Sequence, residues 1–277
     1  MTGLRVVVVT RVPPVLLGFH QAIADLGHEP VALMTLAGES PFAAELLASV
    51  PQGLDVLIPG RRVRIAPLLE TVRPDLVVCM GFPWKVPADA LAVPRLGWLN
   101  GHPSLLPRHR GPVPVAWAIR RGDDELGITF HLMDAELDTG PVLAQRTFPL
   151  GEFEEPDALY ARMGPTVVEA LREALEKIAA GERGAPQEEG GEYETFFVEG
   201  DVWLDLSRPA SEVHRLVWAW LFTIPHGTER GPVLELDGKT VRVLRSSLEE
   251  VEGAVRVECG DGPLWLVRTE PVSPPSA

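Results

Sequence analysis

The sequence predicts an α/β protein: an open, mostly parallel sheet flanked by helices, followed by a small barrel-like β module. Three observations support this fold class. Strand and helix signals alternate through the first half of the chain, the strands there are continuous apolar runs, and the last part contains short strands joined by tight turns. A length of 277 residues leaves room for one large domain and one smaller domain.

The first half repeats a strand–helix unit. The first strand is expected at Leu4–Val9, a β-branched run typical of a strand buried on both faces. A helix with apolar residues at helical spacing follows at Val15–Leu26. A later helix at Pro41–Val50 has Ser40 as a candidate N-cap. The other elements of this half are strands at 31–36, 55–58, 75–80 and 97–99 and a helix at 65–72.

The pattern changes in the middle of the chain. A helix is expected at Val113–Arg121. Two paired strands, Gly127–Met133 and Pro141–Phe148, enclose a turn-rich segment. A long helix at Pro156–Ala180 then closes the larger domain.

We expect the larger domain at residues 1–182 and the smaller, barrel-like domain at residues 201–277. The intervening linker, 183–200, begins with a stretch rich in Gly, Glu and Gln. The smaller domain should contain a helix at Ser211–Leu221, capped by Ser207 or Ser211. Two hairpins should follow, one with Asp237-Gly238 as its turn; their strands lie within 233–244 and at 254–259 and 264–267.

The charge of the chain bears on its partners. It carries 39 acidic and 25 basic residues, a formal net charge of −14. A surface that binds nucleic acid needs clustered basic residues, so this charge argues against such a partner. We find no apolar run as long as the ~18 residues of a transmembrane helix, and the N-terminus is typical of a strand rather than a signal peptide. Cys79 and Cys259 lack metal-ligand spacing. We therefore expect a cytoplasmic protein with no membrane partner and no metal.

Asn100, His102 and Asp138 are the candidate catalytic residues. Asn100 and His102 are expected just past the carboxyl end of a strand, the edge at which open α/β sheets bind ligands. Because they are two residues apart in an extended segment, their side chains can point the same way. Asp138 follows His102 by 36 residues, in a glycine-flanked turn. An amide that donates to a developing oxyanion, an imidazole that handles protons and a nearby carboxylate suit acyl transfer.

Four motifs surround these residues: Asn100-x-His102, Pro103-Ser-Leu-Leu-Pro107, Arg110-Gly111 and Leu137-Asp138-Thr-Gly140. Their order and spacing resemble the 10-formyltetrahydrofolate-dependent formyltransferase family. The resemblance covers residues 4–180 well and 186–270 more weakly. It implies a Rossmann-like sheet with a C-terminal OB-type barrel, and an N-formyltransferase that takes its formyl group from 10-formyltetrahydrofolate without a metal.

The resemblance also implies roles for the three catalytic candidates. Asn100 would polarise the formyl oxygen, and His102 would stabilise the tetrahedral intermediate and pass protons. Asp138 would raise the basicity of His102 and order a water. His109, past the motif proline, is expected on a surface loop and therefore outside the reaction.

A second set of residues is implied at the cofactor. The segment Met80–Pro87 matches the family segment whose main chain hydrogen-bonds the pterin, and Met133–Leu137 would cover the other side of the pterin. The alternative is that aromatic residues of the first segment belong to the core. The implied cofactor-binding residues are Phe82, Trp84, Lys85, Val86, Met133, Asp134 and Leu137.

The chain departs from the methionyl-tRNA enzyme of this family on the acceptor side. That enzyme has a Gly-Thr-Pro loop after the first strand, where this chain has Thr10–Pro14. The short acidic segment Thr35–Ser40 stands where a basic insertion should grip tRNA, and residues 201–277 carry 8 basic and 12 acidic residues. A surface that grips tRNA should be basic.

We therefore expect a small-molecule amine as the acceptor, such as an amino sugar nucleotide or an amino acid. Methionyl-tRNA is the alternative. A formyltetrahydrofolate hydrolase and a non-catalytic folate-binding protein are further alternatives, although the intact Asn100, His102 and Asp138 argue against a protein without catalytic activity. The C-terminal module is a candidate surface for a homodimer or for the acceptor.

Overall fold

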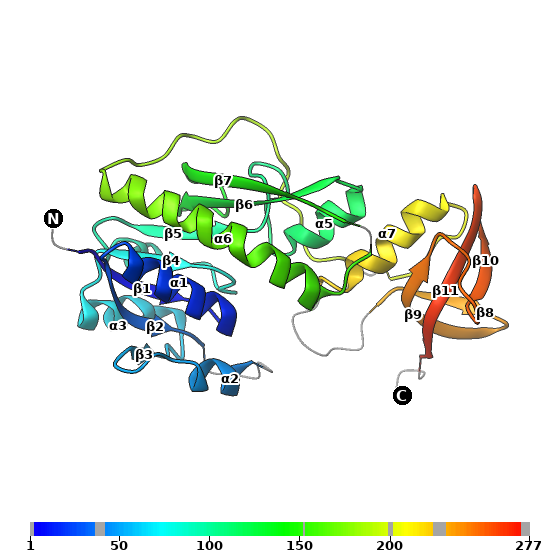
Figure 1. Cartoon of the computed structure of the whole chain (residues 1–277), viewed down its shortest axis with the longest axis horizontal. Coiled ribbons are helices and arrows are strands. Elements are labelled where there is room, and N and C mark those ends of the chain that lie inside the picture. Colours follow the sequence, from blue (N-terminus) through cyan, green and yellow to red (C-terminus); the bar gives the residue numbers. More distant parts are fainter. Residues whose placement is uncertain (1–2, 37–41, 152, 199–201, 224–230, 273–277) are drawn as a thin grey trace. The chain divides into compact units, whose positions relative to one another are not determined.

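The computed structural model describes residues 3–36, 42–151, 153–198, 202–223 and 231–272 (Figure 1). The chain divides into two compact units. Unit 1 consists of Met1–Gly111, Gly127–Phe148 and Tyr160–Tyr193, and unit 2 of Pro112–Leu126, Pro149–Leu159 and Glu194–Ala277. The domain boundaries expected at residues 182 and 200 stay a prediction.

A seven-stranded sheet in the order β3-β2-β1-β4-β5-β6-β7 forms the larger part of the fold. The strands from β3 to β5 in this order are parallel, and β6 is antiparallel to β5. The mostly parallel α/β sheet expected from the sequence is therefore confirmed. Its strands are β1 (Arg5–Val9), β2 (Glu29–Met34), β3 (Asp55–Leu57), β4 (Leu76–Cys79), β5 (Trp98–His102), β6 (Glu125–Leu132) and β7 (Val142–Pro149).

Helices connect these strands as the alternation predicted. They are α1 (Pro13–Asp25), α2 (Ala43–Ala48), the 3₁₀ helix η1 (Arg62–Arg64), α3 (Ile65–Val72), α4 (Ala88–Leu91), α5 (Pro114–Arg121) and α6 (Pro156–Ala179). The N-cap of α2 is Phe42, which makes no side-chain cap hydrogen bond. The start expected for this helix, at Ser40 and Pro41, lies outside the described residues.

Both faces of the sheet are buried around β1, which explains the continuous apolar run of this strand. Val7 and Val9 pack in one cluster with α3 and with Trp98 of β5. On the opposite face, Phe19 of α1 contacts Phe130 of β6, with ring centroids 6.0 Å apart. The absence of a side chain at Gly101 of β5 leaves room for the Phe130 ring, because a Cβ there would lie 2.9 Å from that ring.

The fifth strand is longer than the sequence predicted. We expected it to end at Leu99, with Asn100 and His102 beyond it, but β5 runs through His102. The reason is that Asn100 continues the ladder on both sides, pairing with Cys79 of β4 and with His131 of β6. Asn100 and His102 thus belong to the sheet rather than to a loop.

Unit 2 contains a curled four-stranded antiparallel sheet in the order β10-β11-β9-β8, which is the barrel-like module expected from the sequence. Asp237 and Gly238 have φ of 50° and 72° and form the predicted hairpin turn. The elements of the chain from residue 202 onward are α7 (Ala210–Trp220), β8 (Val233–Leu236), β9 (Lys239–Ser247), β10 (Val255–Cys259) and β11 (Gly262–Pro271).

The predicted serine cap of α7 is wrong. The N-cap is Pro209, and no side chain caps the helix from that position. The hydroxyl of Ser207 donates instead to Asp205 Oδ1 at 2.6 Å. The carboxylate of Asp261, in the β10–β11 turn, accepts the first N–H of the helix, that of Ala210, at 2.7 Å. A residue distant in sequence therefore replaces the local cap.

Candidate active site

One row of residues crosses the sheet at the carboxyl ends of β1 and β4. Val9 pairs with Cys79, Cys79 with Asn100, and Asn100 with His131. Because neighbouring strands lie about 4.8 Å apart, the Cα atoms of Val9 and Asn100 are about 10 Å apart. His102 lies two residues beyond Asn100 and shares its face of the sheet. Asn100, His102 and His131 thus bring polar side chains next to the apolar core cluster that contains Val9 and Cys79.

His131 orients the side-chain amide of Asn100. The amide nitrogen Nδ2 of Asn100 lies 3.1 Å from Nε2 of His131, and Nδ1 of His131 lies 3.2 Å from the carbonyl oxygen of Leu132. A carbonyl only accepts, so Nδ1 carries the ring proton and Nε2 accepts one amide hydrogen of Asn100. Burial, followed by the charge of His102, lowers the pKa of His131 to about 4, so this ring is neutral at pH 7. The second amide hydrogen of Asn100 is left for a substrate oxygen.

Cys79, the neighbour of Asn100 in the row, is a buried thiol rather than a nucleophile. Its pKa is raised to about 12, mainly by burial; a hydrogen bond from the backbone of Phe82 partly opposes this rise, and the nearby Asp138 carboxylate contributes to it. Because the thiolate is the reactive form, a thiol that stays protonated is inert. The chemistry of this edge therefore depends on its nitrogen and oxygen groups.

His102 is buried between the loop that follows β5 and Asp138. Its Nε2 donates to the carbonyl oxygen of His109 at 2.9 Å, and its Nδ1 lies 3.6 Å from Asp138 Oδ1. His109 itself is only 6% exposed. The expectation of a surface position for His109 is therefore wrong, because the loop turns its carbonyl inward to hold the imidazole. Nδ1 is the ring nitrogen of His102 that faces the carboxylate.

Asp138 is held in an unusual backbone conformation. Its φ is +59°, in the left-handed region that residues with a side chain rarely adopt. The N–H of Gly111 donates to its Oδ2 at 3.0 Å. Asp134 closes the same loop, because its Oδ1 accepts hydrogen bonds from the Glu136 backbone at 3.0 Å and from the Thr139 hydroxyl at 2.7 Å. Asp134, expected at the cofactor, thus contributes to the loop that presents Asp138.

An apolar wall lies on the face of the sheet that carries Asn100. Phe82, Trp84 and Met133 are partly buried against the core cluster that contains Val86. The rings of Phe82 and Trp84 meet edge to face, with centroids 5.9 Å apart. The structure therefore brings residues of the two expected cofactor segments together around one cluster. Whether they contact a cofactor stays a prediction.

The main chain of this wall has free polar groups. Val86 is 8% exposed, yet within the described part of the chain the backbone of Trp84, Lys85 and Val86 makes no hydrogen bond with protein. Buried backbone groups normally have partners, so this segment fits a flat heterocycle with donors and acceptors along its edge. Lys85 forms an exposed ion pair with Glu136 at 3.8 Å, and Leu137 is 41% exposed.

Two further features of the described residues bear on the site. No group of three or more His, Cys, Asp or Glu side chains there is placed to hold a metal ion. Over the same residues, no helix has the length and apolar character that crossing a membrane requires.

Comparison with known proteins identifies the family. Residues 61–175 match the family model described as formyl transferase. The chain is 33% identical over 267 residues to the methionyl-tRNA formyltransferase of Pseudomonas paraeruginosa. This alignment covers 90% of the chain and 86% of the relative. The chain belongs to the formyl transferase family. The expectation of a formyl-transferring enzyme is thus confirmed.

Solved structures share the fold of this formyl transferase. HypX from Aquifex aeolicus, in complex with tetrahydrofolic acid, matches 98% of the chain and 44% of its own length, with a TM-score of 0.69 and 21% identity. A protein from Mycobacterium tuberculosis described as a likely sugar N-formyltransferase matches 90% of the chain and 99% of its own length, with a TM-score of 0.64 and 23% identity. The predicted Rossmann-like fold with a C-terminal barrel-like module is therefore confirmed.

Two residues of the formyl transferase site had no assigned role in the sequence analysis. The sequence pattern assigns His131 only to a strand, although a histidine between Phe130 and Leu132 is a usable signal. Gln187 contacts the loop of Asp138 from a stretch that was expected to be linker. The carbonyl of His109 gave no sequence signal, because main-chain contacts do not depend on residue type.

Proposed function

We propose that this enzyme transfers a formyl group from 10-formyltetrahydrofolate to the amino group of methionyl-tRNA. The observation that carries the transfer step is the cluster of Asn100, His102 and Asp138 beside the apolar wall. The P. paraeruginosa relative favours methionyl-tRNA, the alternative acceptor of the sequence analysis, over the small amine that we expected first. A cytoplasmic location and a homodimer remain predictions.

The wall residues suit the pterin of the formyl donor. Phe82, Trp84 and Met133 offer apolar surface, and the free main-chain groups of Val86 and its neighbours offer hydrogen bonds. This combination matches a flat ring whose edge carries alternating donors and acceptors. When bound, the donor supplies an activated formyl group, and these residues would orient it toward Asn100.

Asn100, His102 and Asp138 divide the work of the transfer. Attack of a neutral amine on the formyl carbon puts negative charge on the formyl oxygen and positive charge on the nitrogen. The second amide hydrogen of Asn100 serves the oxygen, because the first is held by His131. Nδ1 of His102 would take the amine proton, and the carboxylate of Asp138, 3.6 Å away, would balance the charge that results. As the bond between the formyl carbon and the donor nitrogen breaks, His102 would return this proton to the donor nitrogen, which leaves as tetrahydrofolate.

Arg11 gives the acceptor side a positive charge. It lies two residues after Val9, which belongs to the same row as Asn100. Its Nε is buried without a hydrogen-bond partner, and among the described residues its guanidinium meets no carboxylate. A guanidinium in this state suits a phosphate. Arg11 therefore favours acceptors that carry phosphate, such as tRNA or a sugar nucleotide.

A phosphorylated small amine, such as an amino sugar nucleotide, is the second candidate acceptor. The net charge of −14 and the acidic excess of residues 201–277 favour it, because tRNA binding needs a basic surface.

One assay separates the two acceptors. The purified protein is incubated with 10-formyltetrahydrofolate and either methionyl-tRNA or a panel of amino sugar nucleotides, and the formylated product is identified by mass spectrometry. We expect formyl-methionyl-tRNA. If only a sugar nucleotide is formylated, methionyl-tRNA is wrong and the second candidate is the acceptor. Formate release without any formylated amine would contradict transfer altogether.

A further inference from the structure

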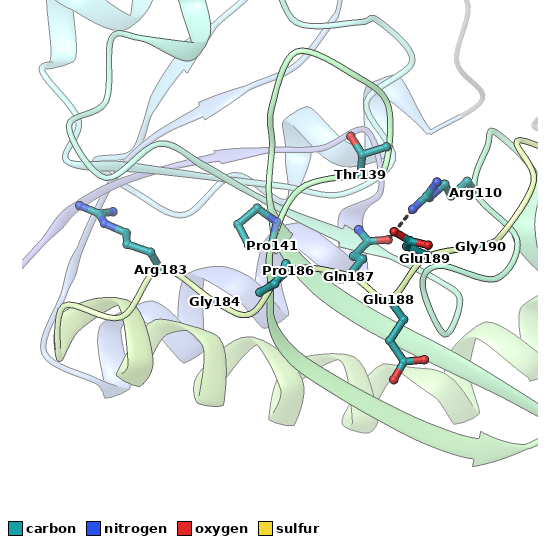
Figure 2. Close-up of a pocket in the computed structure, with 10 residues that line it drawn as sticks. All are labelled: Arg110, Thr139, Pro141, Arg183, Gly184, Pro186, Gln187, Glu188, Glu189 and Gly190. Carbon is teal, nitrogen blue, oxygen red and sulfur yellow. Dashed lines mark hydrogen bonds between the residues drawn. The ribbon is translucent and has the colours of Figure 1, made fainter.

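The stretch expected to be linker is anchored on unit 1 at two points. Ala185 and Val142 of β7 exchange two backbone hydrogen bonds, of 2.7 and 2.8 Å. Tyr193 forms a β-bridge with Arg110. Gln187 lies between these two points and lines a cavity of about 660 Å³ together with Arg110 and Thr139 (Figure 2). Main-chain contacts at Ala185 and Tyr193 therefore position the stretch, independently of the side-chain contacts of Gln187.

Gln187 links the loop of Asp138 to Arg110 through the two ends of its amide. Its Nε2 donates to the carbonyl oxygens of Asp138 and Gly140, each at 2.9 Å. Its Oε1 accepts a hydrogen bond from Arg110 Nη2 at 3.1 Å, and Figure 2 shows the two side chains pointing toward each other. Arg110 thereby fixes the orientation of the amide, because a flipped amide would turn its oxygen toward two carbonyls.

Arg110 and Gly111 hold Asp138 from two sides. The N–H of Gly111 binds the carboxylate, and Arg110 acts on the Asp138 backbone through Gln187. Asp138 needs this support because its left-handed backbone is a conformation that persists only when surrounding structure imposes it. The carboxylate position at His102 depends on that conformation.

We propose that Gln187 and Arg110 are positioning residues that hold Asp138 against His102. The inference rests on the proposed function, in which Asp138 serves the transfer step. Gln187 carries the direct effect, because it donates both hydrogen bonds to the loop. Arg110 acts through Gln187, so its removal should matter only while Gln187 is present.

The experiment compares single and double variants. Gln187→Glu keeps the shape of the side chain but replaces the donating nitrogen with an oxygen that faces two carbonyls. Gln187→Ala, Arg110→Ala and their double variant form a cycle that measures coupling. Gln145→Glu is the matched control, because Gln145 Nε2 likewise donates to two acceptors, Leu106 O at 3.0 Å and Thr129 Oγ1 at 2.8 Å, away from Asp138.

Three quantities are measured for each variant: kcat and KM for 10-formyltetrahydrofolate with methionyl-tRNA, thermal stability, and hydrogen exchange of the 134–140 loop. We expect Gln187→Glu to lose about 10- to 100-fold in kcat, the range that a misplaced catalytic group produces, with KM for the donor little changed. Its loop amides should exchange faster. Gln145→Glu should lose stability but keep most of its kcat, and the double variant should match Gln187→Ala.

Each failure has a separate signature. If Gln187→Glu keeps the parent kcat and the parent loop exchange while Asp138→Asn is inactive, the positioning role is wrong and the proposed function stands. If Gln145→Glu loses as much kcat as Gln187→Glu, the loss reflects general structural damage and the positioning role of Gln187 is wrong. If the parent formylates neither acceptor, the proposed function fails, and loop exchange in Gln187→Glu still decides whether Gln187 holds the loop.

Discussion

Acid should destabilise the fold through His131. Its pKa falls from 6.5 to about 4 on folding, because burial and then the charge of His102 disfavour the protonated ring. Below pH 6.5 the unfolded chain binds a proton at His131, whereas the folded protein binds it only near pH 4. The stability that depends on neutral His131 is therefore fully present above pH 6.5 and is lost as the pH falls toward 4.

The size of the effect follows from this pKa difference. The difference between a pKa of 6.5 in the unfolded chain and about 4 in the folded protein corresponds to about 3 kcal/mol of the free energy of unfolding once the pH is below both values. At pH 5 the unfolded chain is mostly protonated at this position and the folded protein is not, so about 2 kcal/mol of the free energy of unfolding is already lost. His214, whose pKa also falls to about 4 through burial, loses stability in the same window.

A variant isolates the contribution of His131. His131→Gln stays neutral at every pH and keeps a side-chain oxygen that can accept from Asn100. We would measure urea unfolding at pH 7.5 and pH 5 by hydrogen exchange of peptides from β5 and β6, for the parent and the variant. Because His214 is present in both, the difference between their pH dependences should be about 2 kcal/mol. Identical pH dependences would refute the assignment of a neutral, buried His131.

Three further predictions concern activity. His102→Ala and Asp138→Ala should each lose at least about 10²-fold in kcat while still binding the folate donor, and His20→Ala, on α1, should stay near the parent rate. Full activity in Asp138→Asn would remove its assigned role. Trp84→Ala should raise KM for 10-formyltetrahydrofolate with little change in kcat, whereas an unchanged KM would place Trp84 in the core alone. Arg11→Ala should raise KM for a phosphorylated acceptor and leave KM for the donor unchanged; the reverse pattern would contradict an acceptor role for Arg11.

The sheet was predictable because its signals are local. The valine run of β1 reports burial on both faces without knowledge of its neighbours. The turn at Asp237-Gly238 follows from the backbone conformations that these two residues tolerate. The length of β5 was not predictable, because Asn100 and His102 stay in the strand through pairing with β6 and, for Asn100, with β4.

The candidate site was predictable only in part. Asn100, His102 and Asp138 are adjacent in the structure, as the motifs implied, but their supports come from distant segments. His131 meets Asn100 through the antiparallel register of β5 and β6, which the sequence pattern left open. Gln187 lies in a stretch whose composition is typical of a linker, and only the fold brings it to the loop of Asp138.

Single-turnover transfer of a labelled formyl group is the sharpest test of the proposed reaction. Enzyme in excess over labelled 10-formyltetrahydrofolate is mixed with methionyl-tRNA, and the label is followed into the amine product and into free formate. We predict that the parent delivers the label to the amine and that Asn100→Ala, with the donor still bound, is slower by about 10²-fold. Label that appears only as formate, or an undiminished rate in Asn100→Ala, would contradict it.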